Sequence, residues 1–321
     1  MTIARHLCTA IIAIALLSLP VHAQAQEELA ARQSDWRRDL GVLRIGLIND
    51  RPDRVFRRGA RPLATLLRKS LGLPVEILQF RNHTALEDAI ADTRIDYAAL
   101  STVSFARLRH ACKCVDPVVV PADRDGATSF RSVLLAHASG PRSLSLMLDT
   151  PVHYPGSRSF AGYLWPKAVL AGDNFDFDRA DWSLNESATA MEAAMRFTID
   201  SSAALMGWLP SSDNRTGVST KGGTAQVLAR AGFEGGLRVI WKSPAVPHGP
   251  HIIRSKLPKQ AQEKLRETML SLYSDHPSIY DWLEPVHGGG FRKADMKAFA
   301  PVLKALARPD LNGARVSGAT R

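Results

Sequence analysis

The stretch VEILQFRNHTALEDAIADTRIDYAAL, residues 75–100, decides the fold, because two apolar runs enclose a segment with helical features. The runs VEILQF (75–80) and IDYAAL (95–100) have the length and composition of buried strands. Between them, Thr84 is followed three residues later by Glu87, the spacing of a helix-capping box. Strand, helix and strand at such short intervals predict a parallel α/β sheet.

The same alternation extends on both sides of this stretch. VLRIGLI (42–48) is another candidate buried strand, and a helix is expected from Arg61-Pro62 to Gly72. STVSFARLRH (101–110) begins a further helix. These segments together predict one α/β unit.

A second α/β unit follows an extended region at 115–137 that contains no long helix. Its expected elements are an apolar run at 143–148, a helix after GSRSFAGYLWP (156–166), a strand near 181–184, a helix at 186–196, a strand at 203–208 and a helix near 223–231. Extended crossings at 130–137 and 237–242 would join the two units, and a helical tail from 258 to about 306 would return to the first.

This order predicts a two-lobed α/β clamp, each lobe a mostly parallel sheet flanked by helices, with a two-strand hinge. The expected division is 41–133 and 241–321 in lobe 1, and 134–240 in lobe 2. In such α/β sheets a ligand binds in the crevice at the carboxyl ends of the strands. Hinge closure would then cover it.

The first 25 residues have the pattern of a secretory signal peptide: an early arginine, a short apolar middle and small residues at the end. Cleavage is expected near Ala23 or Ala25, and residues 26–40 are a polar leader. The apolar run is shorter than the ~20 residues that a membrane-spanning helix needs. An exported, periplasmic protein is therefore predicted.

The formal net charge is +10, but an exported chain with scattered arginines is not expected to bind nucleic acid. A solvated basic surface and a positive field that collects anions are both open interpretations. Cys112 and Cys114 favour a local disulfide, although with His110 they could also bind a soft metal. His248 and His251 are interpreted as part of a turn, so no metal site and no cofactor is predicted.

The pieces LRIGLI, ALEDAIADTRIDYAAL, GYLWPKAVLAGDNFD and LRVIWKSPAVPHGPHIIRSKLPKQAQEKL, in this order and spacing, resemble the periplasmic substrate-binding proteins of ABC importers for phosphate, phosphite and phosphonate. The resemblance covers nearly all of 42–306. It implies the type II periplasmic-binding-protein fold, in a protein that binds a small anionic solute between its lobes and delivers it to an ABC permease in the inner membrane. A monomer without enzymatic activity is expected.

The resemblance also implies particular site residues. The loop after the third strand contributes Ser101, Thr102 and Phe105, and Phe130 stands at the first crossing where the family usually has tyrosine. The family's Ser-Thr-Ser-Gly-Tyr helix start falls on residues 159–163.

In that helix start, Ser159, Gly162 and Tyr163 match the family, whereas Phe160 and Ala161 replace hydroxyl residues. Fewer hydroxyl donors leave open either an oxyanion held by backbone amides or a larger, more apolar solute.

The remaining candidates are charged or polar residues near predicted strand ends. Ser157 and Arg158 precede the helix start, and each serine there can be a helix cap, a ligand contact or both. Arg51 is a candidate cation of the crevice. Glu186 and Asp200 are carboxylates that would suit a solute that carries an amine as well as an anion.

Two other functions are alternatives to transport. A sensory protein of the same fold would dock onto a receptor ectodomain instead of a permease. An exported hydrolase is disfavoured because the sequence lacks a G-x-S-x-G elbow, an HExxH helix and a nucleotide fingerprint.

Overall fold

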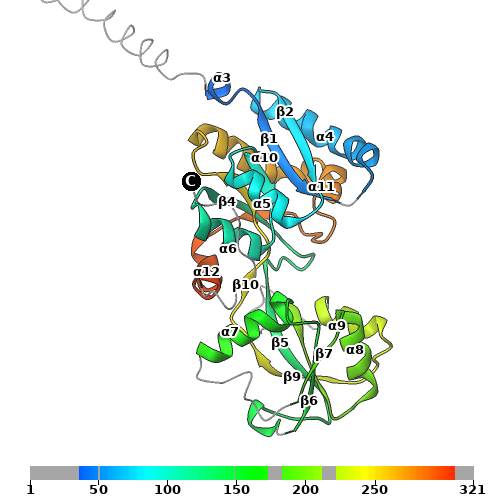
Figure 1. Cartoon of the computed structure of the whole chain (residues 1–321). Coiled ribbons are helices and arrows are strands. Elements are labelled where there is room, and N and C mark those ends of the chain that lie inside the picture. Colours follow the sequence, from blue (N-terminus) through cyan, green and yellow to red (C-terminus); the bar gives the residue numbers. More distant parts are fainter. Residues whose placement is uncertain (1–35, 50, 148, 173–182, 212–221, 308–321) are drawn as a thin grey trace, which may run out of the picture.

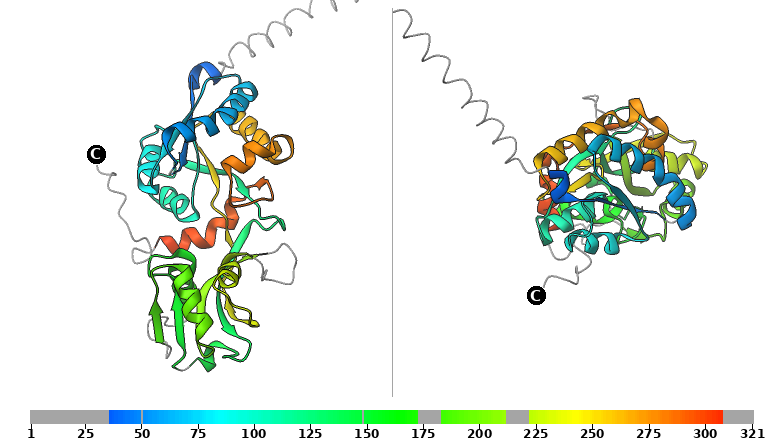
Figure 2. Two further views of the ribbon diagram at one scale, coloured as in Figure 1. Left: turned by 90° about the vertical axis from the view of Figure 1, so that its right-hand side faces the viewer. Right: turned by 90° about the horizontal axis from the view of Figure 1, so that it is seen from above.

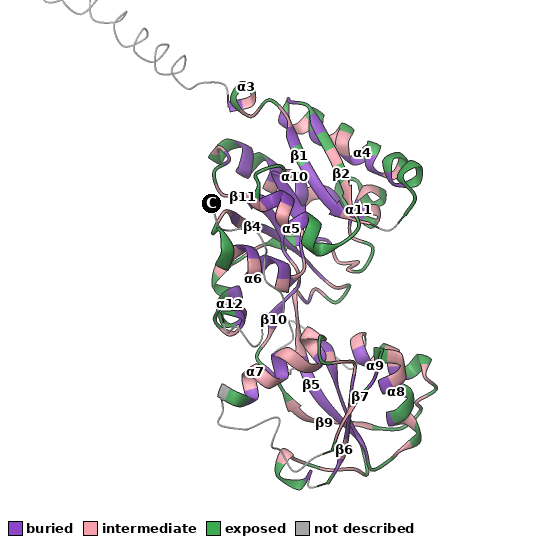
Figure 3. Cartoon of the chain, in the orientation of Figure 1, coloured by how far each residue is buried: buried purple, intermediate pink, exposed green. Residues whose placement is uncertain are grey.

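The computed structural model describes residues 36–49, 51–147, 149–172, 183–211 and 222–307. Two α/β lobes lie one above the other and are joined by extended chain (Figure 1). The predicted fold class, a two-lobed clamp with helices on the sheets, is confirmed. Buried residues concentrate along the strands of both sheets and the helix faces that cover them (Figure 3).

The first lobe is built on a six-stranded sheet whose parallel half comes from the predicted strand–helix–strand pattern. The strands are β1 (Leu43–Ile48), β2 (Val75–Phe80), β3 (Tyr97–Ala99), β4 (Val115–Pro121), β11 (His251–Arg254) and β12 (Phe291–Lys293), in the order β12-β4-β11-β3-β1-β2. β1 pairs in parallel with β2 and β3, whereas β11 is antiparallel to β3 and β4. The result is a mixed sheet with a parallel half.

Helices cover this sheet because each one buries an apolar face. They are α3 (Trp36–Leu40), α4 (Asp53–Leu71), α5 (His83–Ala91), α6 (Thr102–Ala111), α10 (Lys259–Asp275), α11 (Pro277–Leu283), the 3-10 turn η3 (Met296–Phe299) and α12 (Ala300–Leu306). In α4, Leu63, Leu67 and Leu71 recur at helical spacing and are all buried. Asn82 caps α5 by accepting a hydrogen bond from the backbone N–H of Ala85.

The expected start of α4 at Arg61-Pro62 is wrong. The helix begins at Asp53, directly after Pro52, and Pro62 lies inside it. A proline was expected at the first turn because it lacks the N–H that continues the hydrogen-bond ladder. The turns before Pro62 bury Phe56 and Ala60 against the core. Because this tertiary packing stabilises those turns, the helix continues on both sides of Pro62.

The second lobe has its own mixed sheet. Its strands are β5 (Ser129–His137), β6 (Pro151–Tyr154), β7 (Ser183–Glu186), β8 (Ala204–Ser211), β9 (Leu237–Lys242) and β10 (Val246–Pro247), with β10-β5-β8-β6-β7 in order and β9 also paired to β5. Its helices are η1 (Leu144–Leu146), η2 (Phe160–Leu164), α7 (Trp165–Gly172), α8 (Ala190–Ile199) and α9 (Gly223–Arg230). β6 is parallel to β7 and β8, and β5 is antiparallel to β8 and β9.

Two expected boundaries in this lobe are corrected. The apolar run at 143–148 contains the 3-10 turn η1, and the strand is β6, which starts at Pro151. Val152 of β6 is fully buried whereas Leu146 of η1 is 62% exposed, so burial selects the later segment. The helix expected from 186 begins at 190, after the cap Thr189.

The predicted crossing segments 130–137 and 237–242 are β5 and β9, both strands of the second sheet. The chain passes between the sheets at 122–128 and 248–250. Near these connections, α12 packs against α6 of the first lobe and α7 of the second, and in Figure 2 it lies between the lobes (red). The cluster buried there, called here the interlobe cluster, consists of Ala106, Trp165, Val246, Val302 and Leu306.

Cys112 and Cys114 form a disulfide, with their Cα atoms 5.0 Å apart. The local bridge expected from the sequence is therefore present, and neither sulfur is a thiolate ligand for metal. Within the described ranges, no helix is both long and apolar enough to cross a membrane. The predicted signal peptide and most of the predicted leader lie outside the described residues.

Candidate functional site

Strand register shows which edges of the two sheets face each other. In the first sheet, Ala99 at the carboxyl end of β3 pairs with His251, where the chain returns from the second lobe. In the second sheet, Ser211 at the carboxyl end of β8 pairs with Ser129, where the chain enters from the first lobe. The carboxyl ends of both parallel halves therefore lie at the inner edges, where ligands bind in such sheets.

A serine-capped helix begins at the inner edge of each lobe. Ser101 caps α6 by accepting a hydrogen bond from the backbone N–H of Ser104 (3.0 Å). Ser159 caps η2 in the same way, with the N–H of Gly162 at 3.1 Å. η2 is a π-helical turn that continues directly into α7, and such turns are frequent at functional sites.

The hydroxyls at the start of α6 are already committed to the protein. Ser101 donates to the hydroxyl of Ser104 (2.9 Å), which also hydrogen-bonds to His83. Thr102 is buried and donates to the carbonyl of Pro247 (2.8 Å), so it ties α6 to the second sheet. Because one hydroxyl supplies one proton, the Ser101 and Thr102 hydroxyls have no further proton to donate to a solute in this arrangement.

The start of η2 retains donors. The amides of Phe160 and Ala161 occupy the first turn, where helix geometry provides no intrahelical acceptor. The Ser159 hydroxyl accepts the cap bond and still has its own proton to donate. The buried Ser132 hydroxyl donates to the Ala161 carbonyl (2.6 Å) and so fixes this turn to β5. The turn thus presents its N–H groups from a rigid support.

A carboxylate already lies next to this helix start. Glu186, at the carboxyl end of β7, accepts a hydrogen bond from the backbone N–H of Ser157 (2.7 Å). This backbone bond, followed by a bond from the Ser157 hydroxyl, lowers the pKa of Glu186. Arg158 is exposed and adds a smaller electrostatic contribution of the same sign. Ser157, Arg158 and Glu186, singled out separately in the sequence, therefore come together.

The aromatic candidates have partners within the protein. Phe160 packs on Trp165, with ring centroids 5.9 Å apart, and is partly buried against the interlobe cluster. Tyr163 stacks on Tyr154 at 5.1 Å. Phe130 contacts Trp208 edge-on at 5.6 Å and also joins the interlobe cluster.

Three candidates occupy other positions. Phe105 is fully buried, with its ring on Phe299 at 4.9 Å, and belongs to the core of the first lobe. Asp200 precedes β8, whose first residue Ala204 pairs with Ala136, and so lies at the outer edge of its sheet. Phe105 and Asp200 are therefore not placed in the crevice. Arg51 is exposed after β1, near the inner edge of the first sheet.

Sequence reasoning missed three polar groups near the inner edge of the second sheet. The Ser187 and Ser211 hydroxyls and Nε of Arg131 are buried and have no hydrogen-bond partner among the described residues. Ser187 follows β7, and Arg131 lies two residues from Ser129 on β5, with its Nη1 donating to the Ser243 carbonyl (2.7 Å). Buried polar groups normally have partners, so these are candidates for solute contact.

A second polar group joins segments distant in sequence. Asp123 Oδ1 lies 2.7 Å from His287 Nδ1, and Asp123 Oδ2 lies 3.1 Å from His248 Nε2. Burial by itself raises the pKa of Asp123, but the hydrogen bonds and charges of the two imidazoles outweigh it and lower this pKa. His251 belongs to a different group, with Nδ1 at 2.7 Å from the Tyr97 hydroxyl. The two histidines of the PHGPH turn therefore have separate partners.

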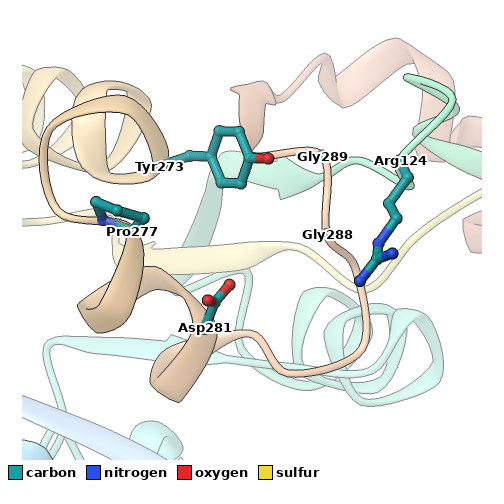
Figure 4. A pocket seen from close by; sticks show the side chains of 6 residues that line it. All are labelled: Arg124, Tyr273, Pro277, Asp281, Gly288 and Gly289. Atoms are coloured by element: carbon teal, nitrogen blue, oxygen red, sulfur yellow. The ribbon is translucent and has the colours of Figure 1, made fainter.

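A surface hollow of about 700 Å³ opens on the first lobe (Figure 4). Its lining residues are Arg124, Tyr273, Pro277, Asp281, Gly288 and Gly289. None of them belongs to either serine-capped helix start. The hollow instead lies beside Asp123 and His287, whose chain neighbours Arg124 and Gly288 line it.

Two α/β lobes, two chain connections and helix starts on facing inner edges define the class: the protein has the fold of a type II periplasmic binding protein. Residues 45–299 match the family model described as ABC transporter, phosphonate, periplasmic substrate-binding protein. The match spans most of the chain, and the protein belongs to this family. The resemblance expected from the sequence is confirmed.

Solved structures share the fold at low sequence identity. XAC2383 from Xanthomonas citri, bound to ATP, has a TM-score of 0.57 and 16% identity, over 83% of this chain and 97% of that chain. PhnD1 from Prochlorococcus marinus, in complex with methylphosphonate, has a TM-score of 0.53 and 16% identity over the same shares. Mycoplasma hyorhinis Mh-p37, a putative thiamine pyrophosphate transporter, has a TM-score of 0.52 and 7% identity, over 82% of this chain and 98% of that chain.

Proposed function

We propose that this protein binds a small oxyanionic solute of the phosphonate, phosphite or phosphate type between its lobes and presents it to an ABC permease. The observation that carries the proposal is the donor set near the inner edge of the second lobe. The first-turn amides of η2 and the Ser159 hydroxyl lie on the face of β5 that carries Ser132, and the buried Nε of Arg131 lies near the same edge on the opposite face; all are groups that donate to anionic oxygen. Family membership and the methylphosphonate complex of PhnD1 support the same class of solute.

The electrostatics of the helix start favour an anion. A helix N-terminus has a partial positive charge and free N–H groups, so it attracts phosphate-like groups. Glu186 already takes the Ser157 amide, and its negative charge disfavours an anion directly beside it. A solute anion would bind at the next amides, and a positively charged amine on the same solute would lie favourably beside Glu186. The proposed solute class therefore includes aminoalkylphosphonates.

The proposed role is to bind the solute without converting it into a product. The family is one of transporter binding proteins and not of enzymes. We propose that the protein acts as a monomer, that its signal peptide is removed near Ala23 or Ala25, and that it works in the periplasm. Products of phosphate- or sulfonate-ester hydrolysis that disappear in a Ser159→Gly variant would contradict this binding role.

The test is calorimetric titration with methylphosphonate, 2-aminoethylphosphonate, phosphite, phosphate, sulfate and methanesulfonate. At 100 times Kd, a ligand adds roughly 2.7 kcal/mol of stability, which a thermal-shift assay would also detect. Arg131→Gln should weaken binding by about 10–150-fold, because hydrogen bonds to charged groups contribute about 1.5–3 kcal/mol.

The matched control is Arg238→Gln. Arg238 is also partly buried and donates to a backbone carbonyl, that of Gly140 at 3.1 Å, but it lies on β9 near the outer edge. A second variant, Ser159→Gly, removes the hydroxyl while a glycine cap costs the helix only a few tenths of a kcal/mol. If no oxyanion binds, or if both arginine variants bind equally well, the proposed site is wrong.

A further inference from the structure

Asp123, His248 and His287 form the one group of three such metal-ligating side chains found among the described residues. Their candidate ligand atoms all lie within 4.8 Å of one another. Asp123 follows β4, His248 lies between β10 and β11, and His287 lies in the loop before β12. The partners of Asp123 are 125 and 164 residues away along the chain, so only the fold brings the three together.

Backbone hydrogen bonds hold the three positions. The N–H of Asp123 donates to the carbonyl of Ala127 (2.8 Å), and the N–H of His248 donates to that of Thr128 (2.9 Å). The N–H of Gly289 donates to the carbonyl of Ala122 (2.8 Å), which brings the His287 loop onto the Asp123 segment. A Cβ on Gly289 would lie 1.9 Å from the Asp123 carbonyl, so only glycine permits this approach. The side chains therefore converge from a fixed frame.

The spacing of the donor atoms suits a small divalent cation. Tetrahedral Zn²⁺ with bonds of about 2.0–2.1 Å places neighbouring ligand atoms about 3.3 Å apart. The two carboxylate–imidazole distances are 2.7 and 3.1 Å, and all three ligand atoms lie within 4.8 Å of one another, so side-chain movements of up to about 1.5 Å would bring them around an ion. Two imidazoles and one carboxylate form a ligand set suited to first-row divalent metals, zinc among them.

We propose that Asp123, His248 and His287 form a Zn²⁺-binding site where the chain connects the two lobes. The carboxylate between the imidazoles opposes an anion and favours a cation. The Asp123 and His287 side chains remain 23% and 16% exposed, so an ion can enter and keep a water in a fourth position.

A bound ion would link both connections between the lobes. Asp123 begins the connection from β4 to β5, and His248 begins the connection from β10 to β11. His287 anchors the ion to the first lobe, where its carbonyl accepts a hydrogen bond from the hydroxyl of the fully buried Tyr280. The site is separate from the donors at the start of η2, and its occupancy does not depend on the identity of the solute.

The test uses the full secreted chain, purified without a histidine tag and treated with a chelator, then titrated with Zn²⁺ by calorimetry. One equivalent should bind, and the thermal midpoint should rise with Zn²⁺ concentration. Loss of a group that merely orients a metal ligand typically costs 10–100-fold in affinity. Removal of a ligand, in His287→Gln or Asp123→Asn, should therefore weaken binding by more than about 100-fold.

The control is His276→Gln, which removes an exposed histidine at the α10–α11 junction and should leave the affinity unchanged. Metal-free unfolding of each variant shows whether it is folded, and visible absorption of bound Co²⁺ reports the ligand set independently. Failure of the wild-type chain to take up Zn²⁺ would overturn the proposal. Equal uptake by folded His287→Gln and Asp123→Asn variants would also overturn it.

Discussion

Replacing Ser132 by alanine tests whether the start of η2 is held in place by β5. Ser132 is fully buried, and its hydroxyl donates to the carbonyl of Ala161 at 2.6 Å. Alanine fits the same space, so the substitution removes the hydrogen bond without overpacking. The Ala161 carbonyl then loses its donor in a site that is partly closed to water.

The expected cost follows from the exposure of the acceptor. A buried polar group left without a partner costs about 1–3 kcal/mol. Because Ala161 is only partly buried, water can reach its carbonyl, and we expect the lower half of this range, about 1–2 kcal/mol. A change of 1 kcal/mol moves the melting midpoint of a domain of this size by roughly 2–4 °C, so the midpoint should fall by about 2–8 °C.

The assay is thermal unfolding of Ser132→Ala beside Ser145→Ala, followed by titration with the best-bound oxyanion. Ser145 is exposed in η1, and its hydroxyl hydrogen-bonds to that of Ser143 (2.9 Å), so its loss should change stability by less than about 0.5 kcal/mol. Solute affinity should also fall in Ser132→Ala, because the amide donors of the turn are no longer held. Equal midpoints and equal affinities for both variants would refute the role assigned to Ser132.

Three further variants test the scaffold. Asp96→Ala removes a buried carboxylate that accepts hydrogen bonds from a guanidinium of β11 (2.7 Å) and a backbone N–H of β1 (2.9 Å). Denaturant unfolding should show a loss of about 3–5 kcal/mol in the free energy of unfolding. The control Asp92→Ala, at an exposed site, should change this free energy little. Replacing Cys112 and Cys114 together by alanine should cost no more than about 1.6 kcal/mol by chain entropy, because the bridge closes a loop of only three residues. Gly249→Ala would place a Cβ 2.1 Å from a backbone carbonyl of the first lobe, so we expect a sharp loss of folded protein in expression and circular-dichroism measurements.

Much of the fold could be predicted because strand and helix periodicity is local. The strands at 42–48, 75–80 and 95–100 lie where the apolar runs indicated, with their ends shifted by up to two residues. Local signals failed where tertiary packing decides the outcome, as it does when α4 continues through Pro62. The four-residue strand β6 also escaped prediction, because Pro151 at its start gives a turn signal and its length gives no periodicity.

The site was less predictable, because the edge of the sheet at which a residue lies depends on the direction in which its strand or helix runs, as well as on the local sequence. Ser159 follows β6 and Glu186 ends β7, both strands run toward the inner edge, and both residues lie there. Asp200 follows a helix that runs back to the outer edge, which a motif alone does not reveal. The grouping of Asp123 with His248 and His287 gives no signal in a single sequence, because long-range pairing leaves no periodicity.

The aromatic residue at position 160 has a structural explanation that connects the binding site to the lobe interface. Where the family resemblance leads one to expect a hydroxyl, Phe160 packs on Trp165 and against the interlobe cluster to which α12 contributes Val302 and Leu306. A phenyl ring has no N–H or O–H group to donate to a solute. Polar contacts must then come from elsewhere near the same edge, where Arg131 has a buried nitrogen without a partner among the described residues. The loss of a hydroxyl from the helix start is therefore compatible with an oxyanion site whose donors come partly from β5.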